Sequence, residues 1–420
     1  MAETQQAQDW DPSDPSVRAN QTTAYDRMRG KCPVAHSDAL NWSLFRHEDV
    51  IRALCDPETF SSAVSRHVAV PNGMDRPEHT IFREVVDRYF TPEKMAEFEP
   101  ALQALTAQLL QELTDDAAPV ASGARGEAVT PGAEKSVTVE VMSELANPFA
   151  LRCQSAFMGW PRELEPELER WVRRNHEATT SRDHSRTSEV ALEFDGYIRQ
   201  LLDDRRDSPA DRDNTSRLLH ETVYDRKFTE DEIVSIVRNW TVGELSTIAG
   251  AVGIVLGYLA EHQDVQRQLR ENPEQIVAAT DEIQRIEDPF VTNRRVTTED
   301  VELSGRKIPA GSKITLMWSS ANRDDTVFSD PDDFRLDRDP EQNLVYGAGI
   351  HVCPGAPMAR LELKVLLEQI FELTERIESA GKSVRAEHPA GGFHTVPVRL
   401  WVIGQNVCMA GACLPAIAPF

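Results

Sequence analysis

Cysteine is scarce in this chain, and its cysteines follow no paired pattern. Six of them stand among 420 residues, at positions 32, 55, 153, 353, 408 and 413. Such scatter argues against a disulfide framework and favours free thiols in a reducing compartment. Cys408 and Cys413 form a C-x4-C with no second pair, which is only a weak metal-binding signal.

Long apolar runs are also missing. No run reaches the roughly 20 residues that a membrane-spanning helix needs. The longest, at 248–260, is rich in glycine and predicts a buried helix. The first sixteen residues are acidic and polar, which is not typical of a signal peptide. We therefore expect a cytoplasmic protein with no membrane partner.

Basic residues are outnumbered, with 45 Lys and Arg against 69 Asp and Glu, and the formal net charge is −24. This charge excludes nucleic acids and anionic membranes as expected partners, because both are negatively charged themselves. The apolar share of 40% is ordinary for a globular protein. Composition alone identifies no partner.

Strand patterns are few, and internal repeats are absent. Segments 313–318 and 395–402 are typical of strands, whereas most of the chain has apolar residues three and four apart, as in helices. The sequence predicts one mainly helical domain over 1–402 with small β-sheets. Within it, 1–20 is expected to be a loose leader and 114–135 and 203–216 surface connections; 403–420 is expected to be a tail or linker stub.

One predicted helix is unusually long. Thr229 and Glu232 form a capping box, and helical character continues to about residue 260, which is about 45 Å. Glycines inside a helix cost about 1 kcal/mol each relative to alanine. Three of them predict close packing against a neighbouring helix, namely Gly250, Gly253 and Gly257.

A fourth glycine of this helix, Gly243, lies in the polar stretch "TVGELST". Hydroxyls and a carboxylate in an apolar helix need partners. The stretch therefore predicts a helix that passes over a ligand. Its polar residues are Thr241, Glu244, Ser246 and Thr247.

The segment "YGAGIHVCPG" (346–355) places one cysteine on a glycine-rich loop directly before a helical pattern. A thiol at a helix N-terminus has a lowered pKa, and Pro354 suits the first helical turn. Glycines let a flat object approach the backbone. The pattern predicts either a thiolate nucleophile, with His351 as a nearby base, or a thiolate metal ligand at Cys353.

The longer stretch "YGAGIHVCPGAPMARLE" resembles the haem-thiolate signature of the cytochromes P450, F-G-x-G-x-H-x-C-x-G-x-x-x-A-R-x-E. It departs from that signature at Tyr346, which replaces phenylalanine. The resemblance to this family extends over residues 20–402. Further segments of the chain match family segments in the same order, and they lie at 75–95, 282–285, 301–324 and 330–338. The resemblance implies a mainly α fold with small β-sheets, with a long central helix over the haem and the cysteine loop on the opposite face.

The resemblance also implies roles for single residues. Cys353 would be the axial thiolate ligand of the iron in haem b. Glu282, Arg285 and Arg338 would form a structural ion-pair triad. The remaining haem contacts would come from His79, Arg83, Arg295, His351, Tyr346 and Gly347.

The reaction that the resemblance implies is reductive activation of O₂, with insertion of one oxygen atom into a small, mostly apolar substrate. Segments 61–74 and 391–396 are expected to line its pocket. Electrons would come from NAD(P)H through a ferredoxin and its reductase, or through a fused flavin and iron–sulfur reductase. The stretch "NWTVGELSTIAGAVG" (239–253) is similar to thiocarbamate-degrading and reductase-fused members of the family.

The family usually has A-G-x-[DE]-T in this helix, and "GELST" departs from it. If Gly243 is the family's glycine, Ser246 takes the threonine position and Leu245 the acid position. If the spacing is counted from the helix end, Thr247 takes the threonine position and Ser246 the acid position, and Glu244, one turn before Thr247, could supply the missing acid. We favour the second register. A peroxide-driven peroxygenase and a non-catalytic gas sensor or binding protein are the alternative functions.

Overall fold

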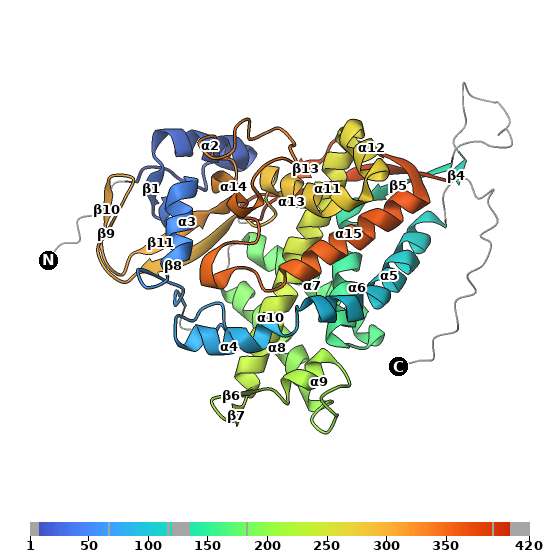
Figure 1. Cartoon of the computed structure of the whole chain (residues 1–420), viewed down its shortest axis with the longest axis horizontal. Coiled ribbons are helices and arrows are strands. Elements are labelled where there is room, and N and C mark those ends of the chain that lie inside the picture. The colour runs from blue at the N-terminus through green and yellow to red at the C-terminus, as the bar shows by residue number, and fades with distance from the viewer. Residues whose placement is uncertain are drawn as a thin grey trace.

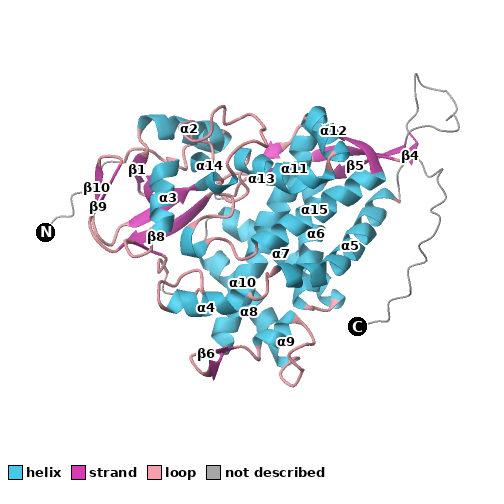
Figure 2. Ribbon diagram, in the orientation of Figure 1, coloured by secondary structure: helices cyan, strands magenta, loops and turns pink. Residues whose placement is uncertain are grey.

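The structure is a computed structural model that describes residues 8–65, 68–115, 118–119, 135–181, 184–388 and 390–403. Helices make up most of it, and the strands form small sheets (Figures 1 and 2). The predicted fold class is therefore confirmed. The expected tail at 404–420, and most of the expected connection at 114–135, lie outside the described residues.

The largest sheet has five strands and lies at one side of the molecule, at the left in Figure 2. Strands β2 and β11 run parallel, and the other pairs are antiparallel. Its inner face is apolar, with Leu44 and Ile314 fully buried. The strands follow the order β1 (Val34–Ser37), β2 (Asn41–Leu44), β11 (Lys313–Met317), β8 (Thr292–Thr297) and β3 (Phe60–Ser61).

Four further sheets are smaller. The four-stranded one joins β12 (Thr374–Ser379), β15 (Pro397–Val402), β5 (Lys135–Glu140) and β4 (Ala118–Pro119). The two-stranded ones are β9 (Val301–Leu303) with β10 (Arg306–Ile308), β13 (Val384–Arg385) with β14 (Phe393–Thr395), and β6 (Thr222–Val223) with β7 (Arg226–Lys227).

Most of the helices form the other side of the molecule and pack on one large apolar core, whereas α2, α3 and α14 lie beside the five-stranded sheet. Helix α15 packs against α5 and α13, and α11 also packs against α13. The α-helices before the long central one are α1 (Pro15–Ala19), α2 (Gln21–Lys31), α3 (His47–Cys55), α4 (Glu78–Asp87), α5 (Pro92–Thr114), α6 (Asn147–Met158), α7 (Glu165–Ser181), α8 (His184–Asp203) and α9 (Asn214–Leu218). Those after it are α12 (Gln263–Glu271), α13 (Ile276–Ile286), α14 (Trp318–Ala321) and α15 (Ala356–Leu373).

The predicted long helix is present and crosses the molecule, with the expected capping box at Thr229 and Glu232 (Figure 1). It is interrupted once. Its parts are α10 (Glu230–Val242), a single π-helical turn η3 (Gly243–Ile248) and α11 (Ala249–Glu261). Such π turns inside α-helices insert an extra residue and often mark functional sites. This one coincides with the polar stretch that the sequence singled out.

The same helix is long and apolar enough to cross a membrane, but 72% of its most apolar window is buried inside the protein. Close packing explains the glycines of α11, whereas a Cβ atom at Gly243 would meet nothing within 4 Å. At Gly253 a Cβ atom would lie 2.3 Å from the Sδ atom of Met142, which belongs to a second π turn, η1 (Val141–Ala146). The neighbours of Gly250 and Gly257 are Pro289 and Val396, which are not helical, so the predicted helix neighbour is wrong there.

The expectation of a loose leader is wrong for residues 8–20. Trp10 is buried and packs edge-on against Tyr25 and Phe45. The Asp9 backbone N–H donates to the His36 carbonyl at 2.8 Å, so the segment is attached to β1. The burial of Trp10 and the bonds of Asp9 to His36 and Arg306 together oppose the entropy cost of ordering this polar stretch.

Candidate active site

The cysteine loop connects two short 3₁₀ turns, η5 (Pro340–Gln342) and η6 (Gly349–His351), to α15. The Cys353 backbone N–H donates to the Tyr346 carbonyl at 2.8 Å, which closes the loop. Gly349 has a φ of 69°, and a Cβ atom there would lie 2.3 Å from the Leu54 carbonyl oxygen. The loop therefore needs glycine to lie against α3.

The helix after the loop begins later than predicted. Pro354 precedes α15, which starts at Ala356, and Pro357 takes the proline-favouring position of the first turn. The Gly355 N–H, which the helix leaves free, therefore points toward the Cys353 thiol rather than into the helix.

The Cys353 side chain is accessible to solvent, yet the atoms around it desolvate it. A group that is both accessible and desolvated borders an enclosed space rather than bulk water. Burial raises the pKa of the Cys353 thiol, and N–H groups of Gly355 and Ala356 oppose this rise without reversing it. The expected lowering of this pKa is therefore wrong for the protein alone, because burial outweighs the helix terminus.

Basic side chains gather next to the loop. The rings of His79 and His351 lie 4.2 Å apart, and Nε2 of His351 is 2.9 Å from Oγ of Ser62. Arg83 bonds to the Ile350 carbonyl at 3.2 Å and to Asp87 at 2.6 Å. The four predicted basic residues come from two elements, α4 and β8, and from the loop. Ser62 was missed, because nothing in its local sequence marks it.

Arg83 is paired with Asp87, but the other three basic groups have no carboxylate partner among the described residues. Both ring nitrogens of His79 are without a hydrogen bond in the described part of the chain. Arg295 is buried, and within the described part of the chain its guanidinium donates to the Arg294 carbonyl and to no carboxylate. Burial lowers the pKa of Arg295 to about 10, and burial with the nearby cations lowers the pKa of His351 to about 3. Such a set fits a ligand that brings carboxylates, as the haem propionates would.

Tyr346 and Gly347 lie on the loop but in different surroundings. The Tyr346 ring packs under the Arg360 guanidinium, 4.6 Å from its centroid, and burial raises the pKa of its hydroxyl. Gly347 has a φ of 73°, and a Cβ atom there would lie 3.4 Å from the Trp318 ring. Both therefore shape the loop, and the Tyr346 side chain points to α13 and α15 residues.

The ion-pair triad is confirmed. Glu282 bonds Arg285 through two contacts of 2.8 and 3.0 Å and bonds Nε of Arg338 at 2.9 Å. Arg285 is fully buried and also donates to the carbonyls of Asn322 and Pro331. One buried carboxylate thus balances two arginines and fixes α13 to the segment before the cysteine loop.

The π turn separates the residues that were expected to act together. Glu244 is buried, Ser246 is exposed and Thr247 is half-buried. Residues three apart share a face in an α-helix but not in the wider π turn. The Glu244 carboxyl lies instead beside Glu362 and Cys153, so the placement does not support it as an acid next to Thr247.

Known proteins resemble this chain in both sequence and fold. A family model described as Cytochrome P450 matches residues 163–374. The chain is also 32% identical over 376 residues to the cyclomarin C epoxidase of Salinispora arenicola, and the match covers 85% of this chain and 89% of that protein. This chain belongs to the cytochrome P450 family.

Other relatives agree. The erythromycin C-12 hydroxylase of Saccharopolyspora erythraea is 29% identical, with 86% of this chain and 89% of that protein covered. The solved structure of the polyketide-synthase cytochrome P450 PksS of Bacillus subtilis superposes with a TM-score of 0.80 at 25% identity, covering 93% of this chain and 99% of that one. This cytochrome P450 is therefore an oxidoreductase, and its family implies a haem cofactor.

Arg295→Leu is expected to weaken haem retention about tenfold or more, because the cytochrome P450 would lose a buried cation that faces a carboxylate. The measurement is the rate at which haem passes to an excess of a haem-binding acceptor protein. Arg294→Leu is the matched control, because Arg294 is the exposed neighbour on the same strand. Equal rates in the two variants would contradict the assignment.

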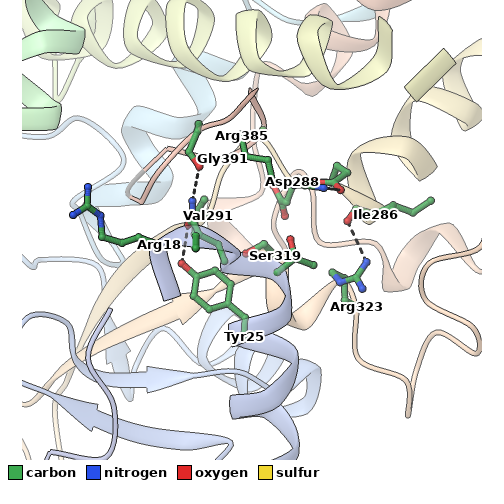
Figure 3. A pocket seen from close by; sticks show the side chains of 15 residues that line it. Arg18, Tyr25, Ile286, Asp288, Val291, Ser319, Arg323, Arg385 and Gly391 are labelled. Atoms are coloured by element: carbon green, nitrogen blue, oxygen red, sulfur yellow. Dashed lines mark hydrogen bonds and ion pairs between the residues drawn. The ribbon is translucent and has the colours of Figure 1, made fainter. Parts of the chain in front are cut away.

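A small cavity of about 30 Å³ lies between α2, the end of α13 and the residues around Gly391 (Figure 3). Asp288 lines it and is buried, with its carboxylate accepting from the Phe290 N–H and the Asn322 amide. Burial raises the pKa of Asp288 to about 8. A cavity of this size holds about one water molecule and is too small for an organic substrate.

Asp288→Asn is expected to stabilise the cytochrome P450 more at pH 8 than at pH 5. A carboxyl whose folded pKa is raised binds its proton more tightly in the folded state. Wild-type stability therefore falls as pH rises from the unfolded pKa of about 4 toward 8, whereas an amide loses nothing. Thermal unfolding of both proteins at the two pH values measures this, and an equal difference at both would contradict it.

Proposed function

We propose that this cytochrome P450 is a haem-dependent monooxygenase that inserts one oxygen atom from O₂ into a small, mostly apolar organic substrate, by hydroxylation or by O-, N- or S-dealkylation. The observation that carries the proposal is the accessible but desolvated thiol of Cys353 beside basic groups that lack an anion. When bound there, haem supplies the activation of O₂. The chain holds the thiolate, binds the propionates and steers protons.

We further propose that electrons come from NAD(P)H through a separate ferredoxin and ferredoxin reductase or through a fused flavin and iron–sulfur reductase. The 239–253 stretch supports a position near the thiocarbamate-degrading and reductase-fused members. The acidic charge supports a cytoplasmic enzyme without nucleic-acid or membrane partners.

Two segments are proposed to line the substrate pocket. Segment 61–74 connects the cysteine loop to the long helix, because Ser62 bonds His351 and the Val70 N–H donates to Ser235. Segment 391–396 lies against the same helix, since Gly392 packs on Ile254.

The proposal is tested by a difference-spectrum screen of apolar candidate substrates, followed by turnover with NAD(P)H and a ferredoxin system. Binding that shifts the haem spectrum, followed by oxygenated product, is the expected result. Spectral binding without any product under reducing conditions would instead identify a sensor or binding protein.

Proton delivery is proposed to run through the Thr247 hydroxyl. In a regular α-helix the first register would need a gap that rotates every later residue by about 100°, but the π turn takes up an extra residue, so this argument no longer separates the two registers. Hydrogen bonding separates the two registers. The Ser246 hydroxyl donates back to the Val242 carbonyl, whereas the Thr247 hydroxyl has no such bond among the described residues. Thr247 is therefore the alcohol that is free to bond to a ligand.

Thr247→Ala is expected to keep haem and substrate binding but to divert most reducing equivalents into hydrogen peroxide, with a loss of about 10²-fold in coupled product typical of a lost proton donor. Ser246→Ala is the matched control and should change little, because its hydroxyl is already satisfied. Product formed per NAD(P)H consumed is the measurement. Unchanged coupling in the threonine variant would reject this relay.

A peroxygenase is the second candidate, and one observation favours it. The carboxyl group nearest in sequence, Glu244, lies in a buried cluster with Glu362 and Cys153 rather than beside Thr247. An enzyme that receives oxygen already as peroxide needs fewer protons from such an acid. Turnover driven by hydrogen peroxide alone, faster than with the ferredoxin system, would favour this function over the monooxygenase.

A further inference from the structure

Three ionisable side chains meet in the core behind the π turn. Cys153 of α6, Glu244 of η3 and Glu362 of α15 have their thiol and carboxylate atoms within 4.8 Å of one another. Cys153 and Glu362 are fully buried, and Glu244 is 7% exposed. The haem and proton roles assigned above use none of these three groups.

The cluster contains acids but no base. Within the described residues no salt bridge reaches either carboxyl, and Oε1 of Glu244 and both oxygens of Glu362 have no N–H donor. Two ionised carboxylates cannot lie together in an apolar core without a large cost. A proton held between them removes one charge and makes an O–H···O hydrogen bond at the same time.

The direction of the pKa values agrees with this geometry. Burial raises the pKa of Glu244 to about 8, and burial together with the neighbouring Glu244 charge raises that of Glu362. Burial and both carboxyls raise the pKa of the Cys153 thiol, so it stays neutral. These are the ionisable groups that act on the pair, from α6, η3 and α15.

The pair sits where the helix is least regular. A π turn is rare and less favourable than α-helix, so something must hold it. Glu244 is the second residue of this turn and is tied to α15, while Ser246 at its centre bonds back to the Val242 carbonyl. If Glu244 were released, the turn could relax toward α-helix, and the faces that present Ser246 and Thr247 would change.

We propose that Glu362 is a positioning residue, which shares one proton with Glu244 and thereby holds the π turn that presents Thr247. This rests on the proposed function for the role of Thr247, but the shared proton itself does not. The proton stays in the core and holds a helix in shape. A divalent metal ion bound by the same three side chains is the competing way to neutralise the cluster.

The first test needs no turnover. Infrared difference spectra of the haem-loaded protein, wild type minus Glu362→Gln, should show the carbonyl stretch of a buried protonated carboxyl. Glu372→Gln is the control, because it removes an exposed acid from the same helix and should give no such band. Absence of the band overturns the proposal, and so does one equivalent of a divalent metal that copurifies with the wild type and is lost in Cys153→Ala.

The second test follows the turn itself by hydrogen–deuterium exchange of residues 243–248. Glu362→Leu should exchange about tenfold faster than wild type, as expected for the loss of one buried hydrogen bond. Glu362→Gln should restore protection, because an amide can donate to or accept from Glu244. Glu368→Leu, which removes an acid from the surface of the same helix, should have no effect.

A third test measures how the exchange of residues 243–248 depends on pH. Wild-type protection at 243–248 should fall at alkaline pH as the shared proton leaves, whereas Glu362→Gln should show no such fall, because its amide N–H still donates to the Glu244 carboxylate. Equal profiles in the two proteins overturn the proposal, even where Glu362→Leu fails to fold. A third outcome is that Thr247→Ala leaves coupling unchanged while the infrared band and the pH dependence are observed. The proton relay through Thr247 would then be rejected, and the proton shared by Glu244 and Glu362 would be retained.

Discussion

Cys353→Ala is expected to abolish the strongly red-shifted Soret band that the carbon monoxide complex of the reduced protein should show. The loss should be complete, because a thiolate trans to carbon monoxide is what gives a haem this spectrum, and an alanine leaves the iron without an axial ligand. Cys353 lies at the end of a loop that Gly349 and the Tyr346 carbonyl fix in place. The measurement is one difference spectrum, in which the spectrum of the reduced protein is subtracted from that of its carbon monoxide complex.

The control for this variant is Cys55→Ala, which removes another accessible free thiol from α3. It should leave the band unchanged, together with haem content. A band that survives in Cys353→Ala would show that a different group ligates the iron, and the proposed function would then lose the observation on which it depends.

Glu282→Ala is expected to prevent the accumulation of soluble, haem-loaded protein. Arg285 is fully buried, and Arg338 is nearly so, with a side chain 9% exposed, so removal of their shared carboxylate leaves two charges without a counter-ion. Breaking a buried pair by removing one partner costs about 3–5 kcal/mol, which is a large part of the stability of an ordinary domain. Haem absorbance per protein in the soluble fraction measures the effect.

Glu274→Ala provides the comparison, because it removes an exposed acid from the turn just before α13. That variant should express and bind haem as the wild type does. Normal haem loading of Glu282→Ala would mean that the two arginines find other acceptors, such as the carbonyls of Asn322 and Pro331, and that the triad is not needed.

The parts of the site that the sequence could predict are those fixed by short-range spacing. Glu282 and Arg285 stand one helical turn apart, and the cysteine loop is a contiguous segment, so both follow from local pattern. The capping box at Thr229 and the strands at 313 and 397 are local for the same reason. These features need no knowledge of how distant segments pack.

What the sequence could not predict depends on distant contacts. The π turn at 243–248 changes which residues share a face, and only the packing of Glu244 against α6 and α15 reveals it. The raised pKa of the Cys353 thiol reflects burial rather than its place before a helix. Likewise Trp10 orders the first described residues by contacts with Tyr25 and Phe45, which no local pattern announces.

The attachment of the N-terminal segment affects a distant part of the fold. Gln21 donates to the Ala386 carbonyl at 2.9 Å, and Arg18 bonds Glu387, so α1 and α2 brace the turn that leads into the proposed pocket segment at 391–396. The first helices thus support the segment that is proposed to shape substrate selection, although they are remote from Cys353 in the chain. Trimming residues 1–20 should therefore change the order of affinities in the substrate screen while leaving the carbonyl spectrum intact.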